Sequence, residues 1–287
     1  MSRASLFLAL TKPRILALVL LSGLPALAIA GGGWPAPGLA LATLLGTALT
    51  AAAANAFNSY LEREPDALME RTRDRPLPSG ALPPTQALVF GFALGALGVG
   101  LLWRVSGPTA AGLALAAVAV YVFVYTLWLK PRTPFAVVVG GFSGAIAPLI
   151  ADAAIQGHVG AAGWLLFAII FIWQPPHFYA IALFRREDYA RAGFPMLPDR
   201  IGEEATYDRI VWWSVALVPV TLLPLFLPGL GPVYGTTASL LGALFLRRAW
   251  QLRRQRDTAS ARRLFLFSLA YLFGLFTAMI IELALSF

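Results

Sequence analysis

The chain has 287 residues, of which 59% are hydrophobic and 13% charged, with no cysteine and a formal net charge of +8. A soluble domain carries about 25% charged residues, so this composition, with a mean hydropathy of +0.73, excludes an ordinary soluble protein. The lack of cysteine excludes disulfides, thiolate metal sites and cysteine nucleophiles. We therefore expect an all-α, polytopic membrane protein whose residues 1–287 form a single domain.

Nine apolar stretches have roughly the length that crosses about 30 Å of hydrocarbon as a helix, the eighth being short. In chain order they cover residues 13–31, 37–58, 85–104, 109–129, 134–156, 161–183, 210–229, 232–247 and 264–286.

The basic residues predict the orientation of these nine spans. If the N-terminus is inside, 21 of the 22 lysines and arginines fall on inner segments and only Arg104 falls on an outer loop. The positive-inside rule then places the N-terminus in the cytoplasm and the C-terminus outside. The surplus of basic residues indicates this topology and contact with anionic lipid, and requires no nucleic acid.

The stretch from Asn58 to Gly80 is the most highly charged part of the chain, with five acids and four arginines beside an apolar span. Asn58, Glu62 and Asp66 are spaced i, i+4, i+8, so on a helix each lies about 40° from the last and the three form one stripe of oxygen acceptors. Such a stripe suits a hard cation, and the arginines at positions 71, 73 and 75 match phosphate oxygens. The stretch predicts a diphosphate site with Mg²⁺; the alternative is a set of solvated acids paired with neighbouring arginines.

Pro65 interrupts this stripe. A proline inside a helix removes one backbone hydrogen bond and kinks the axis, so we expect Asp66 to lie somewhat off the ideal face.

A second charged inner loop follows the sixth span. It begins at Trp173-Gln174-Pro175-Pro176-His177 and continues through Glu187-Asp188-Tyr189. Since it lies four spans after the first charged loop, both should face the same side of the membrane. His177 is either a hydrogen-bonded residue near a helix end or a ligand and proton carrier.

Two acids lie in or at the ends of spans on the outer side, Asp152 and Glu282. A charge in a span is costly, and their distance from the inner loops indicates a structural role or an outer-facing cavity.

The two charged blocks are similar to those of a known family. Asn58-x-Tyr60-x-Glu62-Arg63-Glu64-x-Asp66, followed by Arg71-Thr72-x-x-Arg75-Pro76, resembles the first acidic motif of the UbiA-type intramembrane prenyltransferases. The block from Trp173 to Phe178, with Glu187-Asp188-Tyr189 and Gly193-Phe194-Pro195-Met196-Leu197-Pro198, resembles the branch of that family that acts on haem. The Thr11-Lys12-Pro13-Arg14 and Tyr125-Thr126-x-x-Leu129-Lys130 segments are also similar, so the resemblance covers nearly the whole chain.

The resemblance implies transfer of farnesyl from farnesyl diphosphate to the 2-vinyl group of haem b, giving haem O. It implies helices around a central cavity in the cell's inner (plasma) membrane, with the site on the cytoplasmic side. It leaves open whether the product passes directly to a haem A synthase or to a terminal oxidase assembly.

Roles for individual residues follow from the same resemblance. Asn58, Glu62 and Asp66 would hold Mg²⁺ on the diphosphate, and Arg71 and Arg75 would neutralise the leaving group. The residues expected to bind the substrates are Lys12, Arg14, Tyr60, Lys130, His177, Glu187, Asp188 and Tyr189. The chain departs from the family where it has Glu62 and Glu64, since aspartate is usual at both positions.

Three other functions are compatible with parts of this pattern. A prenyltransferase for an aromatic or quinone precursor would keep the first motif but should lack the block around His177. A transporter of haem or an organic anion would need polar groups accessible from both faces, and here they gather on one. A haem-insertion factor would bind haem without consuming farnesyl diphosphate.

Overall fold

The computed structural model describes residues 2–287, except for the side chains of Arg14 and Ile15. Arg14, one of the residues expected to bind substrate, is therefore outside the described side chains. Throughout the described part the elements are helical, as predicted, and no strand occurs there. In chain order they are α1 (Arg3–Thr11), α2 (Pro13–Gly31), α3 (Pro37–Leu61), α4 (Arg63–Leu68), α5 (Pro84–Val105), α6 (Gly107–Ala119), the π-helix η1 (Val120–Leu129), α7 (Ala136–Ala145), α8 (Ala147–Gln156), α9 (Ala161–Phe184), α10 (Arg186–Arg191), α11 (Leu197–Ile201), α12 (Glu203–Leu222), the 3₁₀ helix η2 (Leu223–Phe226), α13 (Pro232–Gln255) and α14 (Thr258–Ser286).

Seven helices of the described chain are long and apolar enough to cross a membrane: Pro37–Leu61, Pro84–Val105, Gly107–Leu129, Ala136–Gln156, Ala161–Phe184, Glu203–Phe226 and Thr258–Ser286. The bent pair α1 and α2 makes eight if it forms one span. α13 is long enough but is not among them, because arginines at 247 and 248 lower the hydropathy of its apolar part. The eighth predicted span, residues 232–247, therefore stays a prediction.

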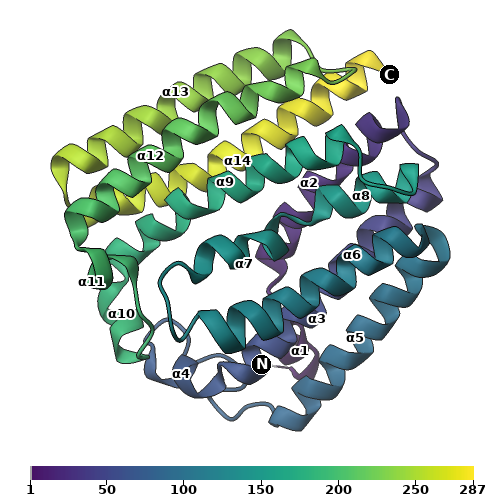
Figure 1. The fold of residues 1–287 in the computed structure, drawn as a ribbon. Coiled ribbons are helices and arrows are strands. Elements are labelled where there is room, and N and C mark those ends of the chain that lie inside the picture. The colour runs from purple at the N-terminus through teal and green to yellow at the C-terminus, as the bar shows by residue number, and fades with distance from the viewer. Residues whose placement is uncertain (1) are drawn as a thin grey trace.

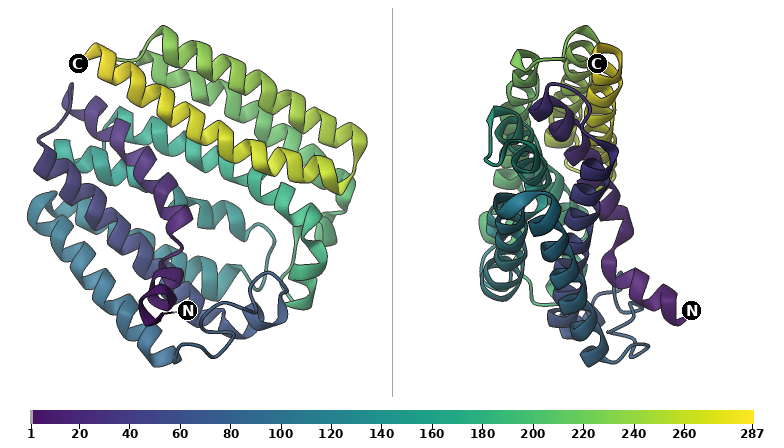
Figure 2. Two further views of the ribbon diagram at one scale, coloured as in Figure 1. Left: turned by 180° about the vertical axis from the view of Figure 1, so that it is seen from behind. Right: turned by 90° about the vertical axis from the view of Figure 1, so that its right-hand side faces the viewer.

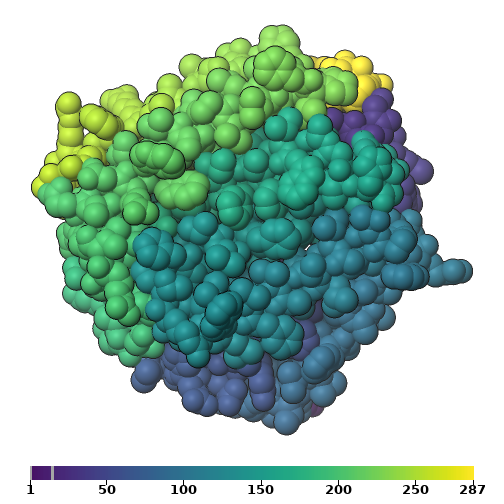
Figure 3. Space-filling model, viewed as in Figure 1, coloured from purple at the N-terminus to yellow at the C-terminus, as the bar shows by residue number. Residues whose placement is uncertain are grey.

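The helices form two groups with a third between them (Figure 1). α9, α12, α13 and α14 lie side by side in one half, and α3, α5 and α6 pack together in the other. α2, α7 and α8 lie between the two groups, and α2 contacts both α3 and α14. Seen from the edge the molecule is a thin slab from which α1 projects (Figure 2). Side chains fill the gaps between the ribbons on the face seen in Figure 1, as the space-filling view shows (Figure 3).

Glycines allow the helices around the first charged loop to approach closely. A Cβ on Gly46 of α3 would lie 2.7 Å from Leu102, and one on Gly98 of α5 would lie 2.9 Å from the carbonyl oxygen of Gly46. Such contacts between small residues let helix backbones meet without the hydrophobic driving force that acts in water. They hold α3, which carries Asn58, firmly against α5.

Two helices run about two turns beyond the apolar spans that were predicted within them. α12 begins at Glu203 rather than 210, and α13 continues to Gln255 rather than 247. The extra turns are too charged for an apolar window, but they pair with each other outside it. Arg253 lies 2.5 Å from Asp208 and 3.2 Å from Glu204, and Arg256 also pairs with Glu204.

The two acids that were predicted to lie on the outer side each stabilise the start of a helix. Asp152 Oδ2 accepts hydrogen bonds from the amides of Gly160 (2.7 Å) and Gly163 (2.8 Å) at the N-terminus of α9. Glu282 accepts from the amides of Val233 (3.0 Å) and Tyr234 (2.7 Å) in the first turn of α13. A helix start leaves four amides without partners and favours negative charge, so these carboxylates have a structural role.

The chain ends lie at opposite ends of the molecule, with the N-terminus near α4 and the C-terminus at the far end (Figure 1). The two charged loops meet at the end that holds α4, because Asp188 in α10 accepts a hydrogen bond from the Glu70 amide at 2.9 Å. Both loops therefore face one side of the membrane.

The absence of cysteine makes this topology easy to test. We expect single cysteines at the exposed positions Ser79 and Ala190 to react with a membrane-impermeant maleimide only after the cells are opened. A cysteine at exposed His158 should react in intact cells. If Ser79→Cys and Ala190→Cys reacted from opposite faces, a site shared by the two loops would be impossible.

Candidate active site

The predicted acceptor stripe forms across the junction of α3 and α4. The Glu62 amide donates to the Asn58 carbonyl at 2.9 Å, and the Asp66 amide donates to the Glu62 carbonyl at 2.8 Å. The helix is interrupted at Glu62, and Pro65 lies in the first turn of α4, where a missing amide hydrogen is tolerated. The i, i+4 hydrogen bonds therefore continue through the junction, and Pro65 does not remove Asp66 from the stripe.

The π-helix η1 presents a matching pair of side chains to α3. Asn58 Nδ2 donates to Thr126 Oγ1 at 3.2 Å, and Lys130 Nζ donates to Glu62 Oε1 at 2.5 Å. The two contacts join residues that are each 68 positions apart, so α3 and η1 run parallel here. π-Helices are rare, and those that occur are often at functional sites.

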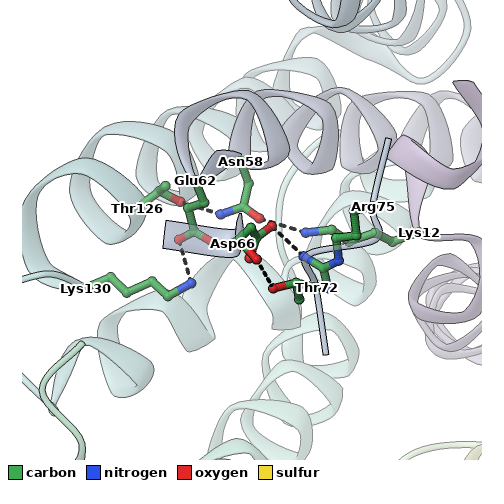
Figure 4. Close-up of polar contacts among 8 residues, drawn as sticks. All are labelled: Lys12, Asn58, Glu62, Asp66, Thr72, Arg75, Thr126 and Lys130. Atoms are coloured by element: carbon green, nitrogen blue, oxygen red, sulfur yellow. Dashed lines mark hydrogen bonds and ion pairs between the residues drawn. The ribbon is translucent and has the colours of Figure 1, made fainter. Parts of the chain in front are cut away.

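Two further basic side chains complete the cluster shown in Figure 4. Lys12 Nζ donates to Asn58 Oδ1 at 2.7 Å, and Arg75 Nη1 donates to Asp66 Oδ2 at 2.8 Å. Thr72 Oγ1 also donates to the Asp66 carbonyl at 2.7 Å, which fixes the loop that carries Arg75. We call these eight residues the polar cluster: Lys12, Asn58, Glu62, Asp66, Thr72, Arg75, Thr126 and Lys130.

The acids of the polar cluster are almost completely buried, since Glu62 is 5% and Asp66 is 2% exposed. A buried charge is costly unless it is paired and hydrogen-bonded, and each acid has a basic partner within 2.8 Å. Three basic side chains face two acidic ones, so the polar cluster keeps one positive charge in excess. This balance favours an anionic ligand.

The side-chain oxygens of the polar cluster suit a divalent cation that a substrate phosphate also binds. No three histidine, aspartate or glutamate side chains come together as a metal site within the described residues. Mg²⁺, however, is usually held by one or two carboxylates together with substrate phosphates. Glu62 and Asp66, with the Asn58 amide oxygen, therefore fit a shared Mg²⁺ and phosphate site.

The second charged loop reaches the first through Asp188. Besides the Glu70 amide, Asp188 Oδ1 accepts from Arg191 at 2.6 Å, and the Arg71 guanidinium lies 6.0 Å from the ring centre of Tyr189. Burial would raise the pKa of Asp188, but the hydrogen bonds from Arg191 and the Glu70 amide outweigh it and hold the pKa below the usual aspartate value. Its Oδ2 is buried and has no hydrogen-bond partner among the described residues.

An apolar pocket lies beside Lys130, between the segment that follows η1, α9 and the second charged loop. Lys130, Tyr125, Tyr189 and Phe194 are among the residues that line it, and the Lys130 ammonium lies 4.6 Å from the ring centre of Phe194. Gly140 makes room for Tyr125, since a Cβ there would lie 2.5 Å from the ring. The pocket has a volume of about 60 Å³, far below the roughly 300–1,000 Å³ of sites for small molecules, so it must widen to admit a large substrate.

His177, in α9, lies apart from the polar cluster and packs against α14. Its ring is stacked between Trp173 and Phe265, with ring centres 4.4 and 4.6 Å away. Nδ1 lies 2.6 Å from Ser268 Oγ, and that hydroxyl donates its hydrogen to the Phe265 carbonyl. Ser268 must therefore accept from Nδ1, so the neutral ring carries its free lone pair on Nε2.

Tyr60 and Glu187 also lie outside the polar cluster, as do Arg71, His177, Asp188 and Tyr189. Tyr60 packs beside Phe7 and Phe90 on the other side of α3, under the Arg63 guanidinium. Glu187 is exposed and forms no ion pair within the described chain.

Sequence reasoning assigned no role to Thr72, Thr126 or Ser268. The signal for Thr126 was its hydroxyl one turn before Lys130 in an otherwise apolar run; Ser268 gave no comparable signal.

Comparison with known proteins agrees with this geometry. The UbiA prenyltransferase family matches residues 19–275. The chain belongs to this family. Among its relatives, the protoheme IX farnesyltransferase of Acidiphilium cryptum is 45% identical over 96% of this chain and 90% of its own length. The protoheme IX farnesyltransferase of Gloeobacter violaceus is 46% identical over 95% of this chain and 90% of its own length.

Solved structures of UbiA-type proteins share the fold at lower identity. A digeranylgeranylglyceryl phosphate synthase superimposes with a TM-score of 0.81 at 18% identity, covering 99% of both chains. A UbiA homologue from Archaeoglobus fulgidus bound to DMAPP and Mg²⁺ gives a TM-score of 0.66 at 16% identity, covering 96% of this chain and 99% of its own. The protein is thus a multi-pass membrane protein with the UbiA prenyltransferase fold.

The contact between the two loops should depend on pH through Asp188. Because the pKa of Asp188 is lowered in the fold, the contact contributes stability above the ordinary pKa of about 4 and loses it as the pH falls through the lowered value. We expect hydrogen exchange at the Glu70 amide, corrected for the intrinsic rate, to be slow at pH 6 and to rise below about pH 4.

Asp188→Asn should remove this pH dependence and lower the protection at pH 6, because hydrogen bonds to a charged acceptor are the stronger ones. Asp208→Asn removes an exposed acid that pairs with Arg253 and is the matched control. Identical profiles for Asp188→Asn and the unaltered protein would contradict the role given to Asp188.

Proposed function

We propose that this protein transfers the farnesyl group of farnesyl diphosphate to the 2-vinyl group of haem b and thereby makes haem O. The observation that carries this proposal is the match to protoheme IX farnesyltransferases at 45–46% identity over 95–96% of the chain. The proposal assigns the reaction to one domain, residues 1–287, in the plasma membrane with both charged loops in the cytoplasm. The polar cluster is its diphosphate side.

Asn58, Glu62 and Asp66 would hold Mg²⁺, which supplies positive charge to the diphosphate as it leaves. The Archaeoglobus fulgidus homologue, bound to DMAPP and Mg²⁺, supports this assignment. Arg75 already lies at Asp66, and Arg71 lies on the same loop beside Tyr189, so both can reach diphosphate oxygens. Lys12 and Lys130 bring two more positive charges from other elements.

The reaction needs charge stabilisation and exclusion of water at the same place. As the allylic C–O bond breaks, negative charge grows on the diphosphate, where fixed cations in a buried site stabilise it most strongly. The aromatic lining next to Lys130, from Tyr125, Tyr189 and Phe194, keeps water from the farnesyl cation until the haem vinyl carbon attacks it. Water then adds to the cation formed on the haem side chain.

His177 is the residue assigned to haem. Its free Nε2 lone pair suits iron or a hydrogen-bond donor, while both faces of the ring are stacked. Glu187, Asp188 and Tyr189 are assigned to the acceptor side, with Tyr189 in the pocket beside Lys130. Asp188 serves this side mainly by holding the two loops together.

Mass analysis of extracted haems tests the proposed function directly. Cells that lack their own haem O synthesis should accumulate a farnesylated hydroxyethyl haem only when they express this chain. Haem b alone, in the presence of correctly inserted protein, would rule the proposal out.

The carboxylate assignment predicts different outcomes for closely related variants. Asp66→Asn removes the charge that binds the cation, and since metal stabilisation of the leaving group amounts to several kcal/mol, turnover should fall by about 10²-fold or more. Glu62→Asp should be tolerated, because the charge remains and the flexible Lys130 can follow it.

Glu64→Gln is the matched control, since its side chain is 82% exposed and pairs only with Arg63. Turnover by all three purified variants would be measured with and without a divalent-metal chelator. Undiminished product formation in the chelator would refute the role of Mg²⁺.

His177 can be tested separately from the diphosphate side. His177→Ala and His177→Phe both remove the ring nitrogens, but Phe keeps the stacking with Trp173 and Phe265. We expect transfer to haem to fall about 10²-fold in both, as misplacing a reacting group by about 1 Å does, while a farnesyl diphosphate analogue binds within a few fold. Full activity of His177→Phe would show that the residue acts through packing alone.

A further inference from the structure

Every polar member of the acceptor stripe has a basic side chain of its own. Lys12 Nζ lies 2.7 Å from Asn58 Oδ1, Lys130 Nζ lies 2.5 Å from Glu62 Oε1, and Arg75 Nη1 lies 2.8 Å from Asp66 Oδ2. The three bases come from the α1–α2 junction, the end of η1 and the loop after α4, so three separate elements converge on one stripe (Figure 4).

Each base is bonded to one oxygen of a side chain that a divalent cation would use. Mg²⁺ binds oxygen at about 2.0–2.1 Å, so an ammonium or guanidinium group within 2.8 Å of that oxygen would lie less than about 5 Å from the metal. Two like charges that close in a buried site repel strongly. A cation on the stripe is therefore strongly disfavoured while the bases stay in place.

The bases can leave only if another anion accepts them, because Lys130 and Arg75 are themselves partly buried, with 19% and 31% of their side chains exposed. Diphosphate oxygens are suitable acceptors for both lysine and arginine. Lys12 forms no ion pair with an acid of the described chain, since its partner Asn58 is uncharged. Lys12 therefore gives up only a hydrogen bond to a neutral amide when it moves to an anion, whereas Lys130 and Arg75 give up ion pairs.

We infer that Lys12, Arg75 and Lys130 are exchangeable counter-ions: they neutralise the acceptor stripe until a divalent cation and a diphosphate arrive together, and then move from the stripe to the diphosphate. The inference rests on the proposed function of the polar cluster and adds a regulatory property to it. Cation and diphosphate bind with positive coupling, and by linkage each raises the affinity for the other by the same factor. The cation alone binds weakly, so the buried stripe is not blocked by metal when no prenyl diphosphate is present.

Metal binding to the purified full-length protein in detergent tests this inference. Mn²⁺ would be titrated and followed by its electron paramagnetic resonance signal, without any diphosphate. Lys130→Gln frees Glu62, and we expect it to bind Mn²⁺ about fivefold or more tightly than the unaltered protein. The same variant should bind an uncleavable thio-analogue of farnesyl diphosphate less tightly in the presence of Mg²⁺. If Lys130 only bound phosphate, its replacement would change the affinity for the analogue but not the affinity for Mn²⁺.

Arg132→Gln is the matched control, because Arg132 lies two residues further on but donates only to the Leu127 and Trp128 carbonyls. It should leave both affinities unchanged. Arg75→Gln repeats the test at Asp66 and decides the matter if Lys130→Gln does not fold. Mn²⁺ affinity that is unchanged or weakened in the folded variant would overturn the inference.

Failure of the inference differs from failure of the proposed function. If the unaltered protein makes farnesylated haem but the variants bind Mn²⁺ no more tightly than it does, only the coupling is overturned. A gain in Mn²⁺ affinity in a protein that makes no farnesylated haem would support the exchange and overturn the assigned reaction.

Discussion

The pairing of Glu62 with Lys130 is the contact on which the rest of the site depends. A carboxylate as deeply buried as Glu62 requires a partner, and that partner lies 68 residues away on another helix. With the parallel contact between Asn58 and Thr126, it sets the register of α3 against η1. The charged stripe and the π-helix are therefore one unit, formed where two apolar helices reach the polar loops.

The remainder of the fold supports this unit. Gly46 and Gly98 bring α3 against α5, and Gly140 accepts the Tyr125 ring, so that η1 can approach from the other side. At the end of the molecule away from the charged loops, the carboxylates of Asp152 and Glu282 accept hydrogen bonds from amides at helix starts. The chain thus uses buried acids in two ways, as helix caps at the end away from the charged loops and as partners of exchangeable bases at the charged loops.

The two charged loops join through backbone as well as side chains. Asp188 binds the Glu70 amide, four residues after Asp66, so α10 helps to position the loop that carries Arg75. The pocket of about 60 Å³ beside Lys130 is lined by the second loop and by the segment after η1, and it has to widen for any substrate as large as a prenyl diphosphate or a haem. Opening and the exchange of ion pairs would then accompany one another.

The sequence by itself determined the helices and the chemistry of the site. Composition and apolar windows predicted the all-helical class, and the i, i+4, i+8 spacing predicted the stripe that the backbone hydrogen bonds of Glu62 and Asp66 preserve. Both signals are local and so can be read along one helix. The charged turns of α12 and α13 lie beyond the apolar windows, and their ion pairs with each other and with Arg186 join residues far apart in the sequence.

Tertiary structure alone decided which base meets which acid. Lys12 and Lys130 are 46 and 68 residues from their partners, and no local pattern encodes a contact between helices that are separated by other spans. The same limit applies to His177, whose stacking between Trp173 and Phe265 and whose tautomer depend on α14. Tyr60, two residues from Asn58, faces away from the polar cluster for a local reason, since two steps along a helix turn a side chain by about 200°.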